Sequence, residues 1–173
     1  MPVIVLLVII AVVAVCAAAF FGYRAYKHRT LAEKLDKRDD DQVHYAFIVN
    51  PSKPQAEQRK QHIKEFCEAK HLTQIEYIET QLDKDGRACA LEALEHGADV
   101  VVAVGGDGTV RTVASAVSGT GHALGIIPIG TGNDFLKNFG PDAARFADAE
   151  NLWDGPRFPL DLIECNGREG LTI

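Results

Sequence analysis

The sequence has little of what nucleic-acid-binding and metal-binding proteins need. Its formal net charge is −6, whereas a nucleic-acid-binding protein typically carries a basic excess. Aromatic residues make up only 8% of the chain, which is few for a platform on which bases could stack. The four cysteines are far apart and form no CxxC pair or Cys/His ligand spacing. These absences argue against a general nucleic-acid binder and against a metal site built from Cys and His.

The sequence also lacks two common nucleotide-binding motifs. The Walker A pattern, GxxxxGK followed by Ser or Thr, is absent, and so is the GxGxxG pattern of dinucleotide-binding domains. A Rossmann-type dehydrogenase is therefore a weak alternative. The glycine-rich turns of this chain therefore belong to neither of these two motifs.

Charge is absent from residues 2–22, which form a continuous apolar run. As a helix this run would span roughly 30 Å, the thickness of the hydrocarbon core of a bilayer. A cleaved signal peptide is the alternative, but no basic region precedes the run and the run is longer than the usual apolar core of a signal peptide. We therefore expect a transmembrane helix over residues 1–23. Arg24, Lys27 and Arg29 follow it, and the positive-inside rule then places the N-terminus outside and the rest in the cytoplasm.

The remainder of the chain predicts a charged stalk and then an α/β domain. Residues 24–42 carry mixed charges, which is typical of a solvated spacer. From there short apolar runs alternate with segments of helical periodicity, a pattern that indicates a doubly wound, mostly parallel sheet over residues 43–155. We expect strands at 44–50, 73–81, 98–106 and 123–130, and helices at 54–71 and 86–97, after the turn at 105–109, after the turn at 130–134 and at 142–153. Residues 156–173 begin with a further predicted strand and read as the start of a second domain.

Two of the predicted strands end in glycine-rich turns, "GGDGT" at 105–109 and "GTGND" at 130–134. In an open α/β sheet ligands bind beyond the carboxyl ends of the strands, and a helix N-terminus there favours a negative charge. Asp107 would repel a phosphate directly, but it suits a hydrated Mg²⁺ beside one. Thr109 could cap the helix or bond a phosphate oxygen. The alternative is a tight turn in which Asp107 merely caps its helix. The second turn at a neighbouring strand end favours a phosphate site.

Three stretches carry a resemblance to a known family. "FIVNPSKP", "VVAVGGDGTVRTVA" and "LGIIPIGTGNDFLKNFG", in this order and spacing, resemble the diacylglycerol kinase catalytic domain family over roughly residues 44–167. The family belongs to a wider group that includes sphingosine, ceramide and NAD kinases and phosphofructokinases. GGDGT is shared across that group, and its pairing with GTGND indicates the lipid-kinase branch.

The resemblance implies a binding site for ATP and Mg²⁺. Gly105 to Thr109 would cradle the ATP phosphates, with Asp107 near Mg²⁺ through a metal-bound water. Residues of the other strand ends would complete the nucleotide cleft. The implied cofactor-binding residues are Asn50, Ser52, Thr80, Gly105, Gly106, Asp107, Gly108, Thr109, Gly130, Thr131, Gly132 and Asn133.

Three features depart from the family pattern. The first loop has Lys53 and Pro54 in a region where the family often has glycine, and Lys53 would either compensate electrostatically or face solvent. Arg111 and Thr112 replace the small polar residue and glutamate that often follow GGDGT. Family enzymes have a second, β-rich domain that supplies the general base and much of the lipid site. The resemblance implies that residues 156–173 are its start, and we expect the base and the lipid site beyond Ile173. Asp134 and Asp161 are the nearest candidates for a base in this chain.

The resemblance therefore implies the N-terminal half of a membrane-anchored, ATP-dependent kinase that phosphorylates a lipid hydroxyl, with diacylglycerol or a similar lipid as substrate. The bilayer would be contacted through residues 2–22. Two alternatives stay open at this point. One is a non-catalytic, membrane-tethered nucleotide-binding module, and the other is a kinase of a soluble metabolite that resembles NAD kinase.

Overall fold

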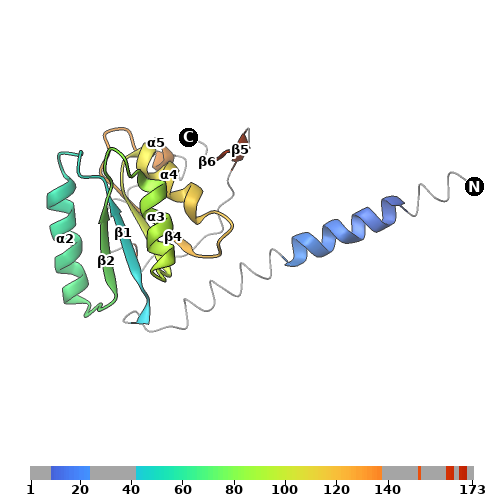
Figure 1. Cartoon of the computed structure of the whole chain (residues 1–173), viewed down its shortest axis with the longest axis horizontal. Helices are drawn as coiled ribbons and strands as arrows, with labels where there is room; N and C mark the ends of the chain where they lie inside the picture. The colour runs from blue at the N-terminus through green and yellow to red at the C-terminus, as the bar shows by residue number, and fades with distance from the viewer. Residues whose placement is uncertain (1–8, 24–41, 138–151, 153–162, 166–167, 171–173) are drawn as a thin grey trace, which may run out of the picture. The chain divides into compact units, whose positions relative to one another are not determined.

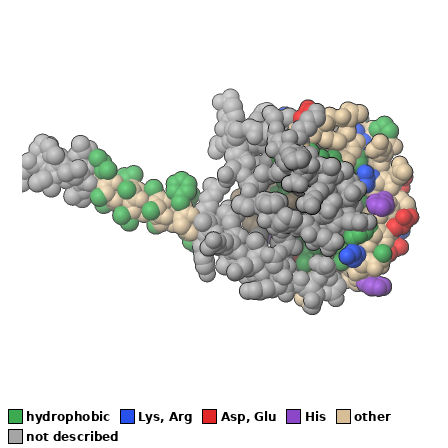
Figure 2. Space-filling model, turned by 180° about the vertical axis from the view of Figure 1, so that it is seen from behind, with side chains coloured by type: hydrophobic (Ala, Val, Ile, Leu, Met, Phe, Trp, Pro, Cys, Tyr) green, Lys and Arg blue, Asp and Glu red, His purple; other side chains and the backbone are tan. Residues whose placement is uncertain are grey.

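The computed structural model describes residues 9–23, 42–137, 152, 163–165 and 168–170 (Figure 1). The chain divides into two units, Met1–Lys37 and Arg38–Ile173. The described part of the first unit is a helix over residues 9–23 whose residues are all exposed, and Figure 2 shows hydrophobic side chains along it. No helix among the residues that the structure describes is both long and apolar enough to cross a bilayer. Residues 2–8 of the expected span lie outside the described residues, and the transmembrane helix stays a prediction.

The second unit contains a four-stranded parallel sheet, as the alternating pattern predicts. Its strands are β1 (Tyr45–Val49), β2 (Ile75–Glu79), β3 (Val100–Gly105) and β4 (Ala123–Pro128), in the order β2-β1-β3-β4. The helices that follow them are α2 (Ala56–Ala69), α3 (Gly86–Glu95), α4 (Asp107–Val117) and α5 (Asp134–Lys137). Every residue of β1 and β3 is buried, as expected for central strands of a parallel sheet that is covered on both faces.

The helices pack on opposite faces of the sheet. Alternate residues of a strand point to opposite faces, and Ala46 and Ile48 of β1 belong to the large apolar cluster formed with α3 and α4. Phe47, between them, stacks on Tyr77 of β2 with ring centroids 5.3 Å apart. Tyr77 in turn faces the thiol of Cys67 on α2, where burial raises the pKa of Cys67 to about 11. The core therefore has one layer under α2 and another under α3 and α4.

Capping residues in the sequence mark where helix α3 begins and ends. Asp85 caps α3, accepting a hydrogen bond from the backbone N–H of Ala88 (2.9 Å). Gly97 follows α3 with a φ of 86°, a conformation that glycine adopts without strain. Near the C-terminus, β5 (Ile163–Cys165) pairs in antiparallel fashion with β6 (Arg168–Gly170). The helix expected at 142–153 lies outside the described residues, apart from residue 152, which is helical.

The strand order places a topological switch point between β1 and β3. From β1 the chain moves to β2 on one side, and then returns across β1 to β3 and β4 on the other side. Loops that leave the carboxyl ends of β1 and β3 therefore diverge, and a crevice opens between them. The loop after β1 begins at Asn50 and the loop after β3 begins at Gly106, so the motifs singled out in the sequence surround this crevice.

Candidate functional site

The two glycine-rich turns touch each other through their backbones. β3 and β4 are neighbours, with Gly105 opposite Pro128, and the N–H of Ile129 donates to the carbonyl of Gly105 (2.9 Å). A Cβ on Gly130 would lie 2.6 Å from the Cα of Gly106, and one on Gly106 would lie 3.3 Å from the Cα of Gly130. Any side chain at Gly130 would therefore push the two strand ends apart. The two turns thus lie at neighbouring strand ends, as the sequence predicted.

A pocket of about 250 Å³ lies where these turns meet the loop after β1. Three strand ends contribute to it, which is the arrangement expected at the carboxyl edge of a doubly wound sheet. Its lining is mostly backbone and short polar side chains: Asn50, Lys53, Gly106, Asp107, Gly108, Thr109, Gly130, Thr131 and Gly132. We call this the glycine pocket.

The first turn presents the open N-terminus of α4 to the glycine pocket. Gly106 is the N-cap residue, and no side chain caps the helix. The first intrahelical hydrogen bond runs from the N–H of Val110 to the carbonyl of Gly106 (3.0 Å). The N–H groups of Asp107, Gly108 and Thr109 precede this bond, and such groups at a helix N-terminus attract anions. The turn thus supplies donors and a favourable dipole at the base of the pocket.

Asp107 joins the two turns. Its Oδ1 atom accepts a hydrogen bond from the backbone N–H of Phe135 in α5 (3.1 Å), and its Oδ2 atom lies 3.2 Å from the position of a Cβ on Gly132. The carboxylate therefore satisfies the N-terminus of α5 rather than that of its own helix α4, contrary to the alternative in which it caps α4. Asp107 and Gly132, beside which Oδ2 lies, both line the glycine pocket.

Thr109 is packed into the turn and does not cap α4. It is buried, with 6% of its surface exposed, and its Oγ1 atom accepts a hydrogen bond from Nδ2 of Asn50 (3.2 Å). A Cβ on Gly105 would collide with that same Oγ1 atom. Gly105 does not line the pocket. Position 105 requires glycine because Thr109 occupies the space that a side chain there would need.

Asn133 closes the second turn on itself. It has a φ of 48°, a left-handed conformation that asparagine tolerates better than most residues. Its Oδ1 atom accepts from the N–H of Gly130 (3.1 Å), and its Nδ2 atom donates to the carbonyl of Gly130 (2.8 Å). Both polar atoms of the side chain therefore form hydrogen bonds inside the turn. Asn133 is not among the residues that line the glycine pocket.

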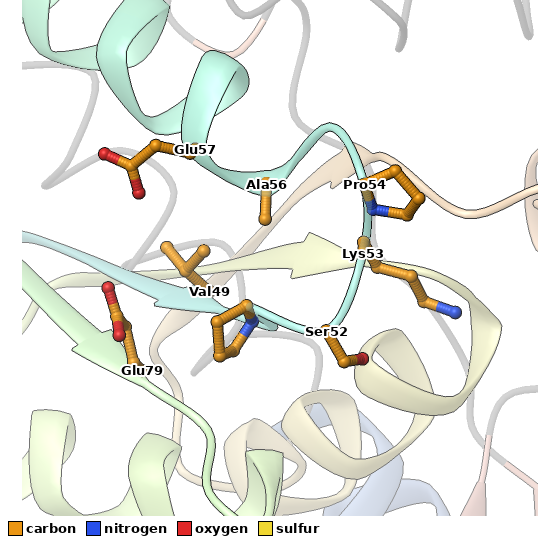
Figure 3. A pocket seen from close by; sticks show the side chains of 8 residues that line it. Val49, Ser52, Lys53, Pro54, Ala56, Glu57 and Glu79 are labelled. Atoms are coloured by element: carbon orange, nitrogen blue, oxygen red, sulfur yellow. The ribbon is translucent and has the colours of Figure 1, made fainter.

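Ser52 and Thr80 also lie outside the glycine pocket. Ser52 donates its hydroxyl to Oδ1 of Asn50 (2.7 Å) and lines an adjacent pocket of about 330 Å³ (Figure 3). That pocket, which we call the proline pocket, is lined by Val49, Pro51, Ser52, Lys53, Pro54, Ala56, Glu57 and Glu79. Thr80 is half-buried beside β1, where its N–H donates to the carbonyl of Val49 (2.9 Å), and it lines neither pocket.

Lys53 lines both pockets, although the sequence alone left its role open. The signal that could have placed it is positional: it lies three residues after Asn50, in the loop that leaves the carboxyl end of a central strand. Arg111, the other basic residue noted in the sequence, is exposed on α4 and lines neither pocket.

These features define an α/β domain with an amide-lined pocket at the carboxyl edge of its sheet. The family model described as "Diacylglycerol kinase catalytic domain" matches residues 44–165. The chain therefore belongs to this family, and the resemblance of the three sequence stretches is confirmed.

Curated relatives and solved structures agree with this assignment. The chain is 46% identical over 93 residues to "Probable lipid kinase YegS-like" from Pseudomonas aeruginosa, covering 53% of this chain and 30% of the relative. It is 40% identical over 88 residues to "Diacylglycerol kinase" from Mycobacterium tuberculosis, covering 50% of this chain and 28% of the relative. A crystal structure of a diacylglycerol kinase from Bacillus anthracis matches with a TM-score of 0.57 and 24% identity, over 73% of this chain and 44% of that one. That structural match shows the fold, and the chain spans less than a third of these two curated relatives.

Proposed function

We propose that this chain is the nucleotide-binding part of a membrane-anchored, ATP-dependent lipid kinase. The whole protein would transfer the γ-phosphoryl group of ATP to a lipid hydroxyl, as the names of its relatives suggest. The observation that carries the proposal is the glycine pocket, in which two backbone turns from neighbouring strands enclose the open N-terminus of α4. Phosphoryl transfer depends mainly on positioning and charge neutralisation, and a pocket of this kind supplies part of both.

The residues of the pocket fit a divalent cation that is held mostly by the nucleotide. Among the described residues no group of three or more His, Cys, Asp and Glu side chains could hold a metal. Mg²⁺ commonly keeps several waters and binds through one or two carboxylates together with substrate phosphates. Asp107, with its Oδ1 atom engaged by Phe135, would offer Oδ2 to a metal-bound water. The cation would neutralise charge on the phosphates.

The acceptor hydroxyl needs a base, and no described residue lining the glycine pocket suits that role. Asp107 is the pocket's one carboxylate, and α5 already uses one of its oxygens. Asp134 is exposed and lines neither pocket, and Asp161 lies outside the described residues. The expectation that the base comes from a second domain is part of this proposal.

The membrane anchor is proposed from the uncharged residues 2–22 and from the exposed apolar helix at residues 9–23. Anchoring would place the domain in the cytoplasm, where ATP is available, and would raise its effective concentration at a lipid substrate. The proposed acceptor is the free hydroxyl of diacylglycerol or of a similar lipid.

The proposal is tested by nucleotide binding to the full chain in detergent micelles. Isothermal titration calorimetry should detect Mg·ATP binding by the wild type, and Asp107→Asn should weaken it because the carboxylate charge beside the metal is lost. Glu95→Gln is the matched control, since Glu95 is exposed on α3 and lines neither pocket. A folded wild type without affinity for Mg·ATP would overturn the proposal. Transfer of radiolabelled phosphate to lipids or to NAD by the full-length protein would then decide the acceptor class.

A further inference from the structure

Lys53 lies in a loop whose backbone is held on both sides. Its N–H donates to the carbonyl of Asn50 (3.4 Å), and its own carbonyl accepts from the N–H of Ala56 as α2 begins (2.9 Å). Pro54 follows it and restricts its backbone to extended conformations. The loop is also tied to the first glycine turn, through the hydrogen bond from Asn50 to Thr109. The Cα of Lys53 is thus positioned relative to α4 before any ligand arrives.

The side chain of Lys53 extends over the first glycine turn. Its Cε atom lies 3.7 Å from the position that a Cβ on Gly106 would take, so the missing side chain of Gly106 leaves room beside the lysine. Figure 3 shows the amine pointing away from the carboxylates of Glu57 and Glu79, which lie on the opposite side of the proline pocket. The ammonium group is therefore directed toward the glycine pocket.

The charges around Lys53 leave it available for an anion. Of the two carboxylates that line the proline pocket, Glu79 is paired with Lys60 on α2. Lys53 makes no ion pair with any residue that the structure describes, and its amine points away from Glu57, the other carboxylate of the proline pocket (Figure 3). Of the nine residues that line the glycine pocket, Lys53 is the one lysine or arginine and Asp107 the one carboxylate. Their formal charges cancel.

We propose that Lys53 is the cationic phosphate-binding residue of this chain, with its ammonium group on the phosphate chain of the nucleotide and opposite Asp107. The inference rests on the proposed function, because it assumes that a nucleotide occupies the glycine pocket. An ammonium on a flexible stem binds phosphate as a point charge with three donors. Without it, the pocket would present the net negative charge of Asp107 to an anionic ligand. Its contribution should therefore grow with the number of phosphates.

The test compares AMP, ADP and ATP binding, with Mg²⁺, to the full chain in detergent micelles by isothermal titration calorimetry. Lys53→Met and Lys53→Gln should each weaken ATP binding about ten-fold or more, as loss of a charge-assisted hydrogen bond does. AMP binding should change much less. Lys53→Arg should restore most of the ATP affinity. Lys64→Met is the matched control, because it removes the same charge from an exposed position on α2.

The outcomes separate this inference from the proposed function. If the wild type binds ATP and both neutral variants bind it equally well, Lys53 has no such role while the nucleotide site stands. If the variants lose AMP and ATP affinity by the same factor, the lysine acts on the shape of the loop and not on the phosphate chain, and the inference is overturned. A folded wild type that binds none of the three nucleotides overturns the proposed function and the role of Lys53 with it.

Discussion

The two glycine-rich turns have similar sequences and different structures. Both follow a strand of the parallel sheet, both contain a glycine–threonine pair and both open a helix. The first turn is open: its cap residue is a glycine, and the first N–H groups of α4 lie along the glycine pocket. The second turn is closed: the side chain of Asn133 makes two hydrogen bonds to the backbone of Gly130. The open turn presents free N–H groups to a ligand, whereas the closed turn contributes backbone to the pocket wall and holds its neighbour in place.

The two turns depend on each other through two contacts. Gly106 and Gly130 meet backbone to backbone, and Asp107 of the first turn accepts a hydrogen bond from Phe135, which follows the second. The closed turn is therefore a support for the open one, and α5 is held at the site by a carboxylate from α4. This division of roles leads to four predictions. They differ in whether a substitution changes mainly the free energy of unfolding or mainly the affinity for the nucleotide.

The largest effect is expected from Gly130→Ala, which would break the contact between the turns. The new Cβ would lie 2.6 Å from the Cα of Gly106 and 2.8 Å from Oδ1 of Asn133. Backbone cannot move aside as a flexible side chain can, so we expect a loss of about 2–3 kcal/mol in the free energy of unfolding, as in overpacked cores. Urea denaturation followed by circular dichroism measures it. Unchanged stability would show that the turns do not press on each other.

Asp107→Ala should have the next largest effect, because it leaves the N–H of Phe135 without its acceptor. The expected loss in the free energy of unfolding is about 1–2 kcal/mol, the usual cost of an unmade hydrogen bond to a charged group. Asp107→Asn keeps an acceptor oxygen and should recover part of that stability, yet it should not recover Mg·ATP binding. Equal stability of the alanine and asparagine variants would show that the bond to α5 contributes nothing.

Asn133→Ala tests whether the second turn acts only as a support. It removes both hydrogen bonds to Gly130 and places alanine at a φ of 48°, so we expect a loss of about 1–2 kcal/mol in the free energy of unfolding. Asn133→Gly removes the same bonds without the backbone strain and should be less destabilising. Under conditions where both variants are folded, the affinity for ATP should change little. A large loss of affinity in the folded glycine variant would instead make Asn133 a ligand-binding residue.

Gly108→Ala should have the smallest effect on the free energy of unfolding. Unlike the other three substitutions, it should stabilise the fold. A Cβ at Gly108 would meet nothing within 4 Å, and its backbone lies in α4. Alanine should therefore stabilise the fold by about 0.5–1 kcal/mol. Because Gly108 lines the glycine pocket, the same methyl group should weaken nucleotide binding. Thermal unfolding and calorimetry on one sample check both. Unimpaired binding would mean that the ligand does not approach this residue.

The sequence was sufficient to predict the sheet, because β1, β3 and β4 are apolar runs, β2 alternates apolar and polar residues, and the helices between them carry periodic apolar faces. The predicted strand at 98–106 corresponds to β3 (Val100–Gly105), and the predicted helix at 86–97 corresponds to α3 (Gly86–Glu95). The pairing of the two turns was also predictable, since parallel strands end at one edge. Membership of the family followed from the order and spacing of three motifs and is confirmed.

The roles of single residues in the site could not be predicted from the sequence in the same way. The direction of the Asn133 side chain depends on a left-handed backbone, and the acceptor role of Asp107 depends on how closely α5 approaches α4. Both are consequences of tertiary packing. Lys53 was left open because a lysine in a loop is usually solvated. Its place at the pocket depends on tertiary contacts, among them the hydrogen bond from Asn50 of its loop to Thr109.

The contact between Gly106 and Gly130 also limits how the protein can change over many generations. When a substitution overfills a core, a smaller residue at the neighbouring position can relieve the strain. Here each partner is already the smallest residue, so a side chain gained at Gly130 has no compensating change at Gly106. Suppressors would have to move the ends of β3 and β4 apart and would open the pocket as they did so. A second substitution that restored stability at this pair would therefore change the shape of the glycine pocket.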